Sequence, residues 1–298
     1  MFILGSIIGL LVMGLAVDTT AGRSVDEDDD TLDHENPDSP DDPDDPEGRV
    51  EIGTEGSDWL AGGDGDDRLE GGDGNDDLHG GLGNDTLLAG AGDDWVYGDD
   101  DYGEQGDDLI DGGAGHDFLA GQGGDDTVRG GAGNDSIYGG DGDDLLQGGD
   151  GDDWISGNAG NDTLIAGRGT DDLDGGDGDD VLYGSAAGDN AWLHGGAGND
   201  TLYVGSGDFG EGGAGNDRFV LDEPGDTVPI IGDYNRAEDV IELRFRADED
   251  EPDPFVTLER GDDGSTLIRL DGAAVARVLG QTGLRAEDII LTRLQPRG

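Results

Sequence analysis

The sequence predicts an all-β repeat protein, and three observations carry this prediction. A nine-residue period runs from Gly53 to Val220 as 18 units. In each regular unit the sixth residue is Asp and the eighth is aliphatic or Phe, while glycine recurs at the first, second and fourth positions. The apolar eighth residue between variable neighbours indicates one short strand per unit with alternating faces. One such strand cannot bury its apolar side chain alone, so the units must stack on one another.

The repeat is regular apart from three faults. Gly62–Glu70 reads GGDGDDRLE, and Gly130–Tyr138 reads GGAGNDSIY. The faults are five extra residues at 98–102, two extra residues within 184–194 and one missing residue within 204–211. Asp keeps the sixth position in all 16 regular copies although its neighbours vary. A salt-adapted acidic surface would scatter its acids, so this fixed phase indicates a row of ligands.

The composition excludes several classes of protein. The 298 residues include 74 Asp+Glu against 15 basic residues, every one of them Arg, and the formal net charge is −59. Such a chain cannot release counterions from nucleic-acid phosphates, which excludes nucleic acid as a partner. The lack of Cys excludes a disulfide framework and a Cys-based zinc site. With 62 Gly and 32% apolar residues, the chain resembles a disordered one unless something neutralises its acids.

Each position of the unit has a chemical reason. Glycines at positions 1, 2 and 4 permit backbone angles closed to other residues, so a six-residue turn can curl its carbonyl groups inward. The Asp at position 6 adds a carboxylate at the edge of this turn. The last three residues form the strand, with position 8 facing inward and positions 7 and 9 outward. Extra acids at positions 3 and 5, such as Asp64 and Asp143, favour a solvated acidic surface over a ligand role.

The repeats resemble the GGxGxDxUx nonapeptide of the RTX (hemolysin-type) calcium-binding family over more than half of the chain. The resemblance implies a parallel β-roll solenoid with two units per coil, in which unit n stacks on unit n+2, and a β-rich C-terminal cap. Stacked turns would form an all-oxygen cage that suits Ca²⁺ better than Mg²⁺, and we expect roughly 12–14 calcium ions. The candidate ligands are Asp58, Asp67, Asp76, Asp85, Asp94, Asp108, Asp117, Asp126, Asp135, Asp144, Asp153, Asp162, Asp171, Asp180, Asp200 and Asp217.

The energetics predict that folding depends on the metal. Each unit buries one apolar side chain, whereas ordering its glycines costs more conformational entropy than ordering any other residue. Repulsion among the Asp carboxylates also opposes compaction. We therefore expect a disordered chain without calcium and a rigid roll with it, so that metal binding and folding form one event.

The outward positions carry aromatic residues in a pattern. The four Trp residues fall in odd-numbered units, which the resemblance would place on one sheet with Tyr97, Phe118 and Tyr138; they are Trp59, Trp95, Trp154 and Trp192. Four threonines fall in even-numbered units and would lie on the other sheet: Thr86, Thr127, Thr163 and Thr201. An exposed aromatic face suits sugar rings or a partner sheet. The alternative is that strand-favouring residues simply fall on strands. The outward positions are too mixed for the regular Thr or Asn row of an ice-binding solenoid.

The two ends differ from the repeats, and the predicted domains are 1–25, 26–52, 53–220 and 221–298. Residues 2–17 are apolar but shorter than the roughly 20 residues that span a bilayer. They lack a basic n-region, so a membrane anchor and an atypical signal peptide both stay open. Residues 26–52 are acidic and Pro-rich and predict a disordered linker.

The region 221–298 is expected to be β-rich. Two strand-like runs, 255–259 and 266–270, flank a Gly-Asp-Asp-Gly turn and indicate a hairpin. By resemblance, this region caps the roll and serves as an uncleaved type I secretion signal; the alternative is a purely structural cap. Three acids would lie near the last turns of the roll: Asp226, Asp233 and Asp239.

No catalytic constellation is visible in the sequence. His34-Glu35 lacks the second histidine of an HExxH zinc motif, and no GxSxG elbow occurs. The remaining histidines, His79, His116 and His194, fall on outward or turn positions and are expected to face solvent. The sequence thus predicts a non-enzymatic, calcium-dependent structural or surface-interaction module, extracellular or at the cell surface. The alternative is a secreted lectin-like adhesin or accessory protein that uses the aromatic face.

The expected partners follow from these features. They are calcium ions, a polysaccharide or cell-surface partner, the type I secretion apparatus and, through the N-terminal segment, a membrane.

Overall fold

The computed structural model describes residues 48–99, 105–185, 189–222, 227–247, 252–280 and 283–295. The chain divides into two compact units, Met1–Asn36 and Pro37–Gly298, and every described residue belongs to the second. The predicted N-terminal segment 1–25 and most of the predicted linker 26–52 lie outside the described residues.

The described residues form two β-sheets, which we name sheet A and sheet B. In spatial order, sheet A contains β1 (Val50–Ile52), β3 (Arg68–Asp73), β5 (Thr86–Ala91), β7 (Leu109–Ala114), β9 (Thr127–Ala132), β11 (Leu145–Asp150), β13 (Thr163–Arg168), β15 (Val181–Tyr183), β17 (Thr201–Tyr203), β19 (Arg218–Leu221), β21 (Val240–Arg246) and β25 (Ile289–Leu294). Sheet B contains β2 (Trp59–Asp64), β4 (Asp77–Leu82), β6 (Trp95–Asp99), β8 (Phe118–Gly123), β10 (Ser136–Asp141), β12 (Trp154–Ala159), β14 (Thr170–Asp177), β16 (Asn190–Ala197), β18 (Phe209–Ala214), β20 (Ile230–Ile231), β24 (Ala273–Val278), β23 (Thr266–Leu270) and β22 (Val256–Arg260).

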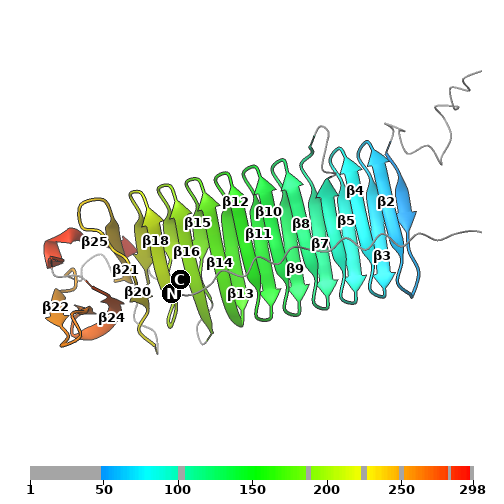
Figure 1. Cartoon of the computed structure of the whole chain (residues 1–298). Helices are drawn as coiled ribbons and strands as arrows, with labels where there is room; N and C mark the ends of the chain where they lie inside the picture. Colours follow the sequence, from blue (N-terminus) through cyan, green and yellow to red (C-terminus); the bar gives the residue numbers. More distant parts are fainter. Residues whose placement is uncertain are drawn as a thin grey trace, which may run out of the picture. The chain divides into compact units, whose positions relative to one another are not determined.

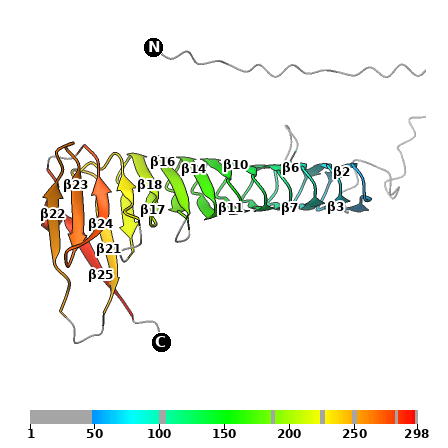
Figure 2. The same cartoon turned by 90° about the horizontal axis from the view of Figure 1, so that it is seen from below.

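Consecutive strands of the repeats alternate between the two sheets, so two nonapeptide units make one coil (Figures 1 and 2). Neighbouring strands of the roll run parallel, and residues 18 positions apart stand opposite one another, as Ile137 opposite Ile155. Unit n therefore stacks on unit n+2. This arrangement confirms the predicted all-β, parallel β-roll solenoid. In the described part of the chain the only helical turn is a 3₁₀ segment, Ala286–Asp288.

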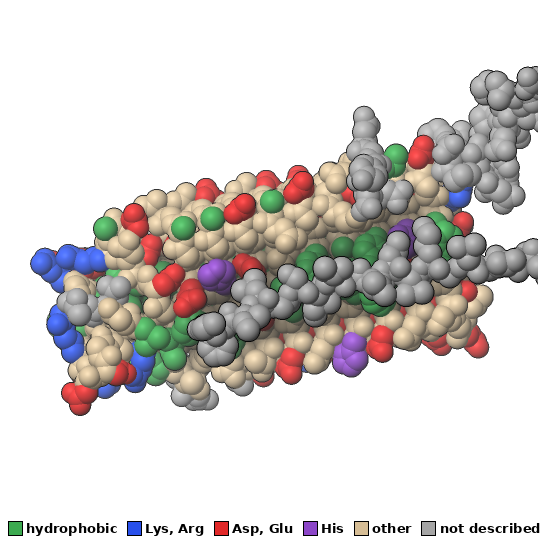
Figure 3. Space-filling view, in the orientation of Figure 1, with side chains coloured by type: hydrophobic (Ala, Val, Ile, Leu, Met, Phe, Trp, Pro, Cys, Tyr) green, Lys and Arg blue, Asp and Glu red, His purple; other side chains and the backbone are tan. Residues whose placement is uncertain are grey.

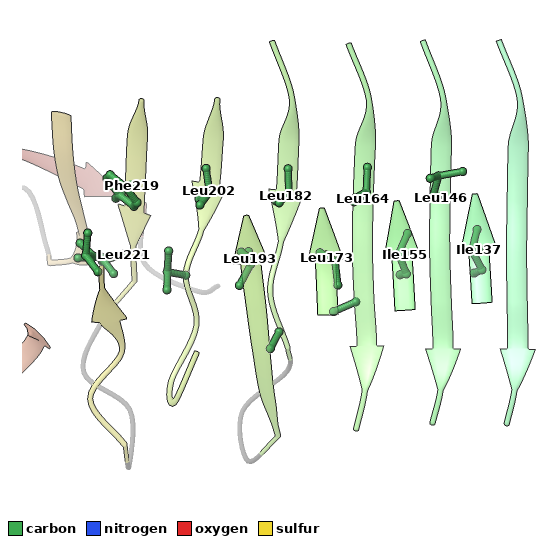
Figure 4. Close-up of a cluster of buried hydrophobic side chains, with 14 of the residues drawn as sticks. Ile137, Leu146, Ile155, Leu164, Leu173, Leu182, Leu193, Leu202, Phe219 and Leu221 are labelled. Carbon is green, nitrogen blue, oxygen red and sulfur yellow. The ribbon is translucent and has the colours of Figure 1, made fainter. Parts of the chain in front are cut away.

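The apolar eighth residues form the core between the sheets. Figure 4 shows Ile137, Leu146 and Ile155 on strands of both sheets, with their side chains in the shared interior. All three are completely buried, as strand alternation predicts for position 8. The shortened unit 204–211 has Gly210 at the equivalent place, and the side chain of Val204 fills the space beside it.

The regular strands are six residues long, not three as the sequence predicts. Strand β10 begins at Ser136, position 7 of one unit, and ends at Asp141, position 3 of the next. Gly140 pairs across the sheet with Asn158, so the parallel ladder extends through the glycines. Identical units stacked in register gain backbone hydrogen bonds from this extension. The turn is therefore confined to positions 4–6.

Glycine is required at positions 1 and 4 for different reasons. Gly142, at position 4, has a φ of 138°, which side-chain-bearing residues rarely adopt. Gly139, at position 1, has no such backbone requirement, and the expectation of a special conformation there is wrong. Its constraint is space, because a Cβ atom on Gly139 would lie 2.1 Å from Oδ2 of Asp144.

The five-residue insertion lies later in the chain than the sequence predicts. Gly98 and Asp99 continue strand β6, and Asp99 pairs with Gly81 of β4. A Cβ atom on Gly98 would lie 2.1 Å from Oδ2 of Asp108, the same relation that other position-1 glycines have to their Asp. Gly98 therefore begins this unit, and the extra residues are 100–104 rather than 98–102.

The C-terminal cap continues both sheets of the roll. Strand β21 pairs in parallel with β19 and β25 and extends sheet A. Strand β20 pairs with β18 and β24 and extends sheet B. Strands β22, β23 and β24 are antiparallel, with Val256 opposite Leu270, and this confirms the predicted hairpin. The cap thus covers the last coil with paired backbone.

Candidate metal centres

The structure arranges the 16 predicted ligand residues in two columns, one along each edge of the roll where the chain turns from sheet to sheet. Each column is held together by hydrogen bonds from backbone N–H groups to side-chain carboxylates. The N–H of Asp126 donates to Oδ1 of Asp144 over 2.8 Å, and the N–H of Asp144 donates to Oδ1 of Asp162 over 2.8 Å. The same bond bridges the insertion, from Asp85 to Asp108. One column contains Asp67, Asp85, Asp108, Asp126, Asp144, Asp162, Asp180, Asp200 and Asp217, and the other contains Asp58, Asp76, Asp94, Asp117, Asp135, Asp153 and Asp171.

The second carboxylate oxygen of most of these residues is buried without a hydrogen-bond partner among the described residues. This holds for Oδ2 of 14 of them: Asp67, Asp76, Asp85, Asp94, Asp108, Asp117, Asp126, Asp135, Asp144, Asp153, Asp162, Asp171, Asp180 and Asp200. An unpaired buried polar atom costs free energy, and a carboxylate costs more than a neutral group. Fourteen repetitions of this cost indicate that a positively charged ligand belongs beside each oxygen.

Burial raises the pKa of these carboxyl groups. It raises the pKa of Asp126 to about 8, with backbone hydrogen bonding from Asp108 acting in the opposite direction and the charge of Asp144 adding to the increase. Burial likewise raises the pKa of Asp144 to about 6. Without a cation, some of these carboxyl groups would be protonated at neutral pH, Asp126 more than Asp144.

Carbonyl oxygens converge on the same space as the unpaired carboxylate oxygens. A point at the Cβ position of Gly62 lies 2.1 Å from Oδ2 of Asp67 and 2.3 Å from the carbonyl oxygen of Gly80. Gly62 has no side chain to occupy the space between these two oxygens. Oxygens gathered in this way fit a hard cation such as Ca²⁺, which takes carboxylate and backbone carbonyl ligands. Position-6 Asp and position-1 carbonyl groups would therefore hold the ion.

No cluster of three or more acidic or histidine side chains that could hold a metal occurs in the described part of the chain. The turns explain this result, since each brings one buried carboxylate and otherwise offers backbone oxygens. The oxygen ligands of a metal ion would therefore come from stacked turns.

Arg49 and Thr54 contact the Asp residues at the N-terminal ends of the columns. Oδ2 of Asp58 accepts hydrogen bonds from the backbone N–H and the hydroxyl of Thr54, over 2.6 and 2.9 Å. Asp67 accepts a bond from the backbone N–H of Arg49. Burial raises the pKa of Asp67, but the Arg49 backbone bond and the Arg49 charge both oppose that increase. Asp58 thus differs from the Asp residues between the ends because its Oδ2 is paired, whereas Oδ2 of Asp67 has no partner among the described residues.

Two further acids join the columns at the C-terminal end. Oδ1 of Asp208 accepts the N–H of Ala191 over 2.8 Å, the bond that position-6 Asp residues make elsewhere, while its Oδ2 accepts the N–H of Gly205. Sequence analysis missed Asp208 because its unit lacks one residue; aligning that unit on the strand that follows would have found it. Asp239 accepts the N–H of Asp217 over 3.1 Å, and Asp226 lies outside the described residues.

The acids at position 5 form a separate, exposed ladder. Oδ1 of Asp125 accepts the N–H of Asp143 over 2.8 Å, and Oδ1 of Asp143 accepts the N–H of Asn161 over 2.7 Å. His116 occupies the same position, and its Nδ1 accepts the N–H of Asn134 over 2.8 Å. Side chains at position 5 therefore accept hydrogen bonds from the backbone of the neighbouring turn. The sequence predicts only a solvated acidic surface there.

The four Trp residues lie on sheet B together with Tyr97, Phe118 and Tyr138, as the repeat numbering predicts. Seven rings on strands β2 to β12 of sheet B form a continuous chain of contacts, with centroid distances from 4.9 to 6.1 Å. We name these rings the aromatic stripe; they are Trp59, His79, Trp95, Tyr97, Phe118, Tyr138 and Trp154. Figure 3 shows hydrophobic side chains gathered along this face. His79 stacks on Tyr97 at 5.0 Å and is only partly exposed.

The fold and the turns together define a metal-binding β-roll, in which two columns of buried carboxylates border a solenoid of nonapeptides. The particular family follows from comparison with known proteins. The RTX calcium-binding nonapeptide repeat matches overlapping segments that run from residue 52 to residue 219, and the chain belongs to this family. Its repeats bind calcium, and a β-roll of this kind is typically structural rather than catalytic.

Two other comparisons add little to this assignment. A search of curated proteins found no match to the chain. Among solved structures, the extracellular lipase LipA from Serratia marcescens is similar over 83% of this chain, with 21% identity and a TM-score of 0.21. The chain spans 40% of that lipase. Within the described residues, no helix has the length and apolarity needed to cross a membrane.

Proposed function

We propose that this protein is an extracellular or cell-surface module whose β-roll folds on binding roughly 12–14 calcium ions, one beside each unpaired position-6 carboxylate oxygen. The observation that carries the proposal is the set of 14 buried Oδ2 atoms without a partner among the described residues. Calcium would supply the charge that each oxygen lacks. Because the same oxygens are widely separated in an unfolded chain, binding and folding would be coupled.

The number of ions tests the proposal. Equilibrium dialysis of the full chain against calcium, followed by atomic emission, should give roughly 12–14 bound ions per chain, one for nearly every interior position-6 Asp. Magnesium at the same concentration should give far fewer, because it demands a tight octahedron. Fewer than about four calcium ions, or equal binding of both metals, would contradict it.

The location outside the cell is supported by the chemistry of the sites. Adaptable all-oxygen sites suit the high calcium concentrations of extracellular modules. We infer that residues 221–298 act as cap and type I secretion signal. Deleting 227–298 should leave the protein inside the producing cell, whereas the full chain should appear in the medium or on the surface. Export without this region would contradict the secretion role and leave the calcium role unaffected.

A second candidate function, that of a lectin-like adhesin, is favoured by the aromatic stripe. Trp59 is 68% exposed and Trp95 is 56% exposed, yet both belong to a contiguous row of rings on a flat sheet face. Exposed apolar patches of this kind mark interaction sites. Replacing Trp95 and Trp154 by Ser should abolish binding to a polysaccharide array in calcium. Replacing Thr127 and Thr163 on sheet A by Ser is the matched control, and equal binding by both variants would remove this function.

A further inference from the structure

A pocket of about 290 Å³ opens on sheet A, on the opposite side of the roll from the aromatic stripe. It lies where β15, β17, β19 and β21 stand side by side. Its lining includes Tyr183, Ser185, Tyr203, Val220, Asp222 and Arg244. None of these residues belongs to the two columns of position-6 carboxylates.

The pocket exists because two of the repeat faults meet in space. Strands β15 and β17 end after three residues, at Tyr183 and Tyr203, whereas regular strands of the roll continue for six. Among the described residues that follow, Gly184 and Ser185 after β15 and Val204 and Gly205 after β17 lie outside any strand. Since β15 pairs directly with β17, the two interruptions lie next to each other and leave a hollow.

The pocket is lined by two aromatic rings and by an ion pair in which the charges of Arg244 and Asp222 cancel. The rings of Tyr183 and Tyr203 are stacked at 4.5 Å, with an angle of 9° between their planes. The guanidinium carbon of Arg244 lies 5.0 Å from the centre of the Tyr203 ring. Asp222 accepts two hydrogen bonds from Arg244, from Nε over 2.7 Å and from Nη2 over 3.1 Å. The guanidinium group has five N–H donors, so this pair leaves donors for a ligand.

Ser185 provides an independent sign that the pocket receives a polar ligand. Its residue is only 8% exposed, and its hydroxyl has no hydrogen-bond partner among the described residues. A hydroxyl can both donate and accept, so leaving it buried and unpaired costs free energy. Ser185 is one of the residues that line the pocket.

We propose that this pocket binds a single neutral sugar residue, either a free monosaccharide or the end of a glycan chain. Stacked rings with a few convergent polar groups are the usual lining of a small-ligand site, and a sugar offers both an apolar face and hydroxyl groups. The Arg244 charge is already balanced by Asp222, and the net charge of −59 repels anionic sugars. The site is independent of the aromatic stripe.

The test uses the calcium-loaded full chain and saturation-transfer NMR with the methyl glycosides of glucose, galactose, mannose and N-acetylglucosamine, with glucuronic acid as the anionic comparison. At least one neutral glycoside should bind saturably, and glucuronic acid should bind at least tenfold more weakly. Ser185→Ala and Tyr183→Leu should each weaken binding at least tenfold. Thr127→Ser, on strand β9 of the same sheet and outside the pocket lining, is the control and should leave binding unchanged.

Ser185→Ala removes one oxygen atom, so it keeps the test decisive even where Tyr183→Leu disturbs the fold. Absence of binding by every neutral glycoside would overturn the proposal, and so would equal binding by wild type and both pocket variants. Circular dichroism of the same samples in calcium reports the folding of the roll separately. A failed sugar site would therefore leave calcium-dependent folding intact.

Discussion

The position-6 Asp uses its two oxygens for different tasks. In Asp144, Oδ1 accepts the backbone N–H of Asp126 and joins adjacent coils, while Oδ2 is buried without a partner in the described structure. The neighbouring Asp143 is exposed and uses its Oδ1 for the N–H of Asn161. On the proposed function, two adjacent acids of one turn have separable roles, one in metal binding and one in satisfying the turn backbone.

Substitutions at these two positions should differ in their effects. Asp144→Asn keeps an acceptor for Asp126 but removes the charge, so we expect the loss of one or two bound calcium ions. Asp144→Ala also leaves the N–H of Asp126 unpaired, which should cost about 1–3 kcal/mol of unfolding free energy in calcium. Asp143→Asn is the control, because Asn161 holds the same position naturally, and it should change stability by less than about 0.5 kcal/mol. Calcium titration measures the number of bound ions, and thermal unfolding measures the stability. Equal losses of bound calcium and of stability for the Asp143 and Asp144 variants would contradict the division of roles.

Acidification should partly replace calcium. Burial raises the pKa of Asp126 to about 8 and that of Asp117 to about 7, so protons bind the folded calcium-free chain more tightly than the unfolded chain. This contribution is complete below the ordinary pKa near 4 and is lost as the pH rises through 7 to 8. Far-UV circular dichroism of calcium-free protein should therefore show growing β-structure from pH 8 to pH 4. A spectrum of an unordered chain at every pH in that range would contradict the burial of these Asp carboxyl groups in the folded calcium-free chain.

At the scale of one coil, glycine positions differ in their tolerance. Position 2 accepts Gln122 and Asn158 at φ values of 82° and 72°. Position 4 is Gly in every regular unit, and at Gly142 a Cβ atom would lie 2.0 Å from the carbonyl oxygen of Gly124. That carbonyl belongs to the backbone of the neighbouring coil, so it cannot move aside as a flexible side chain would.

Asn substitutions within one turn test this difference. Gly142→Asn should lower the unfolding free energy in saturating calcium by at least about 2 kcal/mol, since it adds strain at φ 138° and a clash with Gly124. Gly140→Asn, at position 2 of the same unit, starts from a φ of 133° and a contact of 1.9 Å with the carbonyl oxygen of Gln122, but position 2 adopts a φ of 72° where Asn158 stands, so relaxation toward that angle should make the loss smaller. Thermal unfolding compares the two variants. A larger loss of unfolding free energy for Gly140→Asn than for Gly142→Asn would show that position 4 is not the more constrained glycine.

The sequence was sufficient for features that recur in every unit and insufficient for those that depend on pairing between distant units. Position 8 and position 6 were predictable because each copy repeats the same local chemistry. The start of the unit after Tyr97 was not, since both Gly98 and Gly103 can open a nonapeptide and only pairing with Gly81 decides. The pocket was not predictable either, because Tyr183 and Tyr203 become neighbours only when two faults stack.

The whole roll is a one-dimensional stack in which each coil contacts its neighbours. The full chain has a net charge of −59, and roughly 12–14 calcium ions would neutralise nearly half of that charge. Charge neutralisation and strand pairing are therefore expected to advance together along the columns. The cap offers paired strands at one end, on which the last coil can order.

The most direct measurement is far-UV circular dichroism of the full chain at neutral pH, recorded in excess EGTA and then in millimolar calcium. The account predicts a spectrum of an unordered chain in EGTA and a β-sheet spectrum after calcium is restored, with no such change when magnesium is added instead. An identical β-sheet spectrum in EGTA and in calcium would show that the buried carboxylates are stable without the metal, and would contradict the central claim.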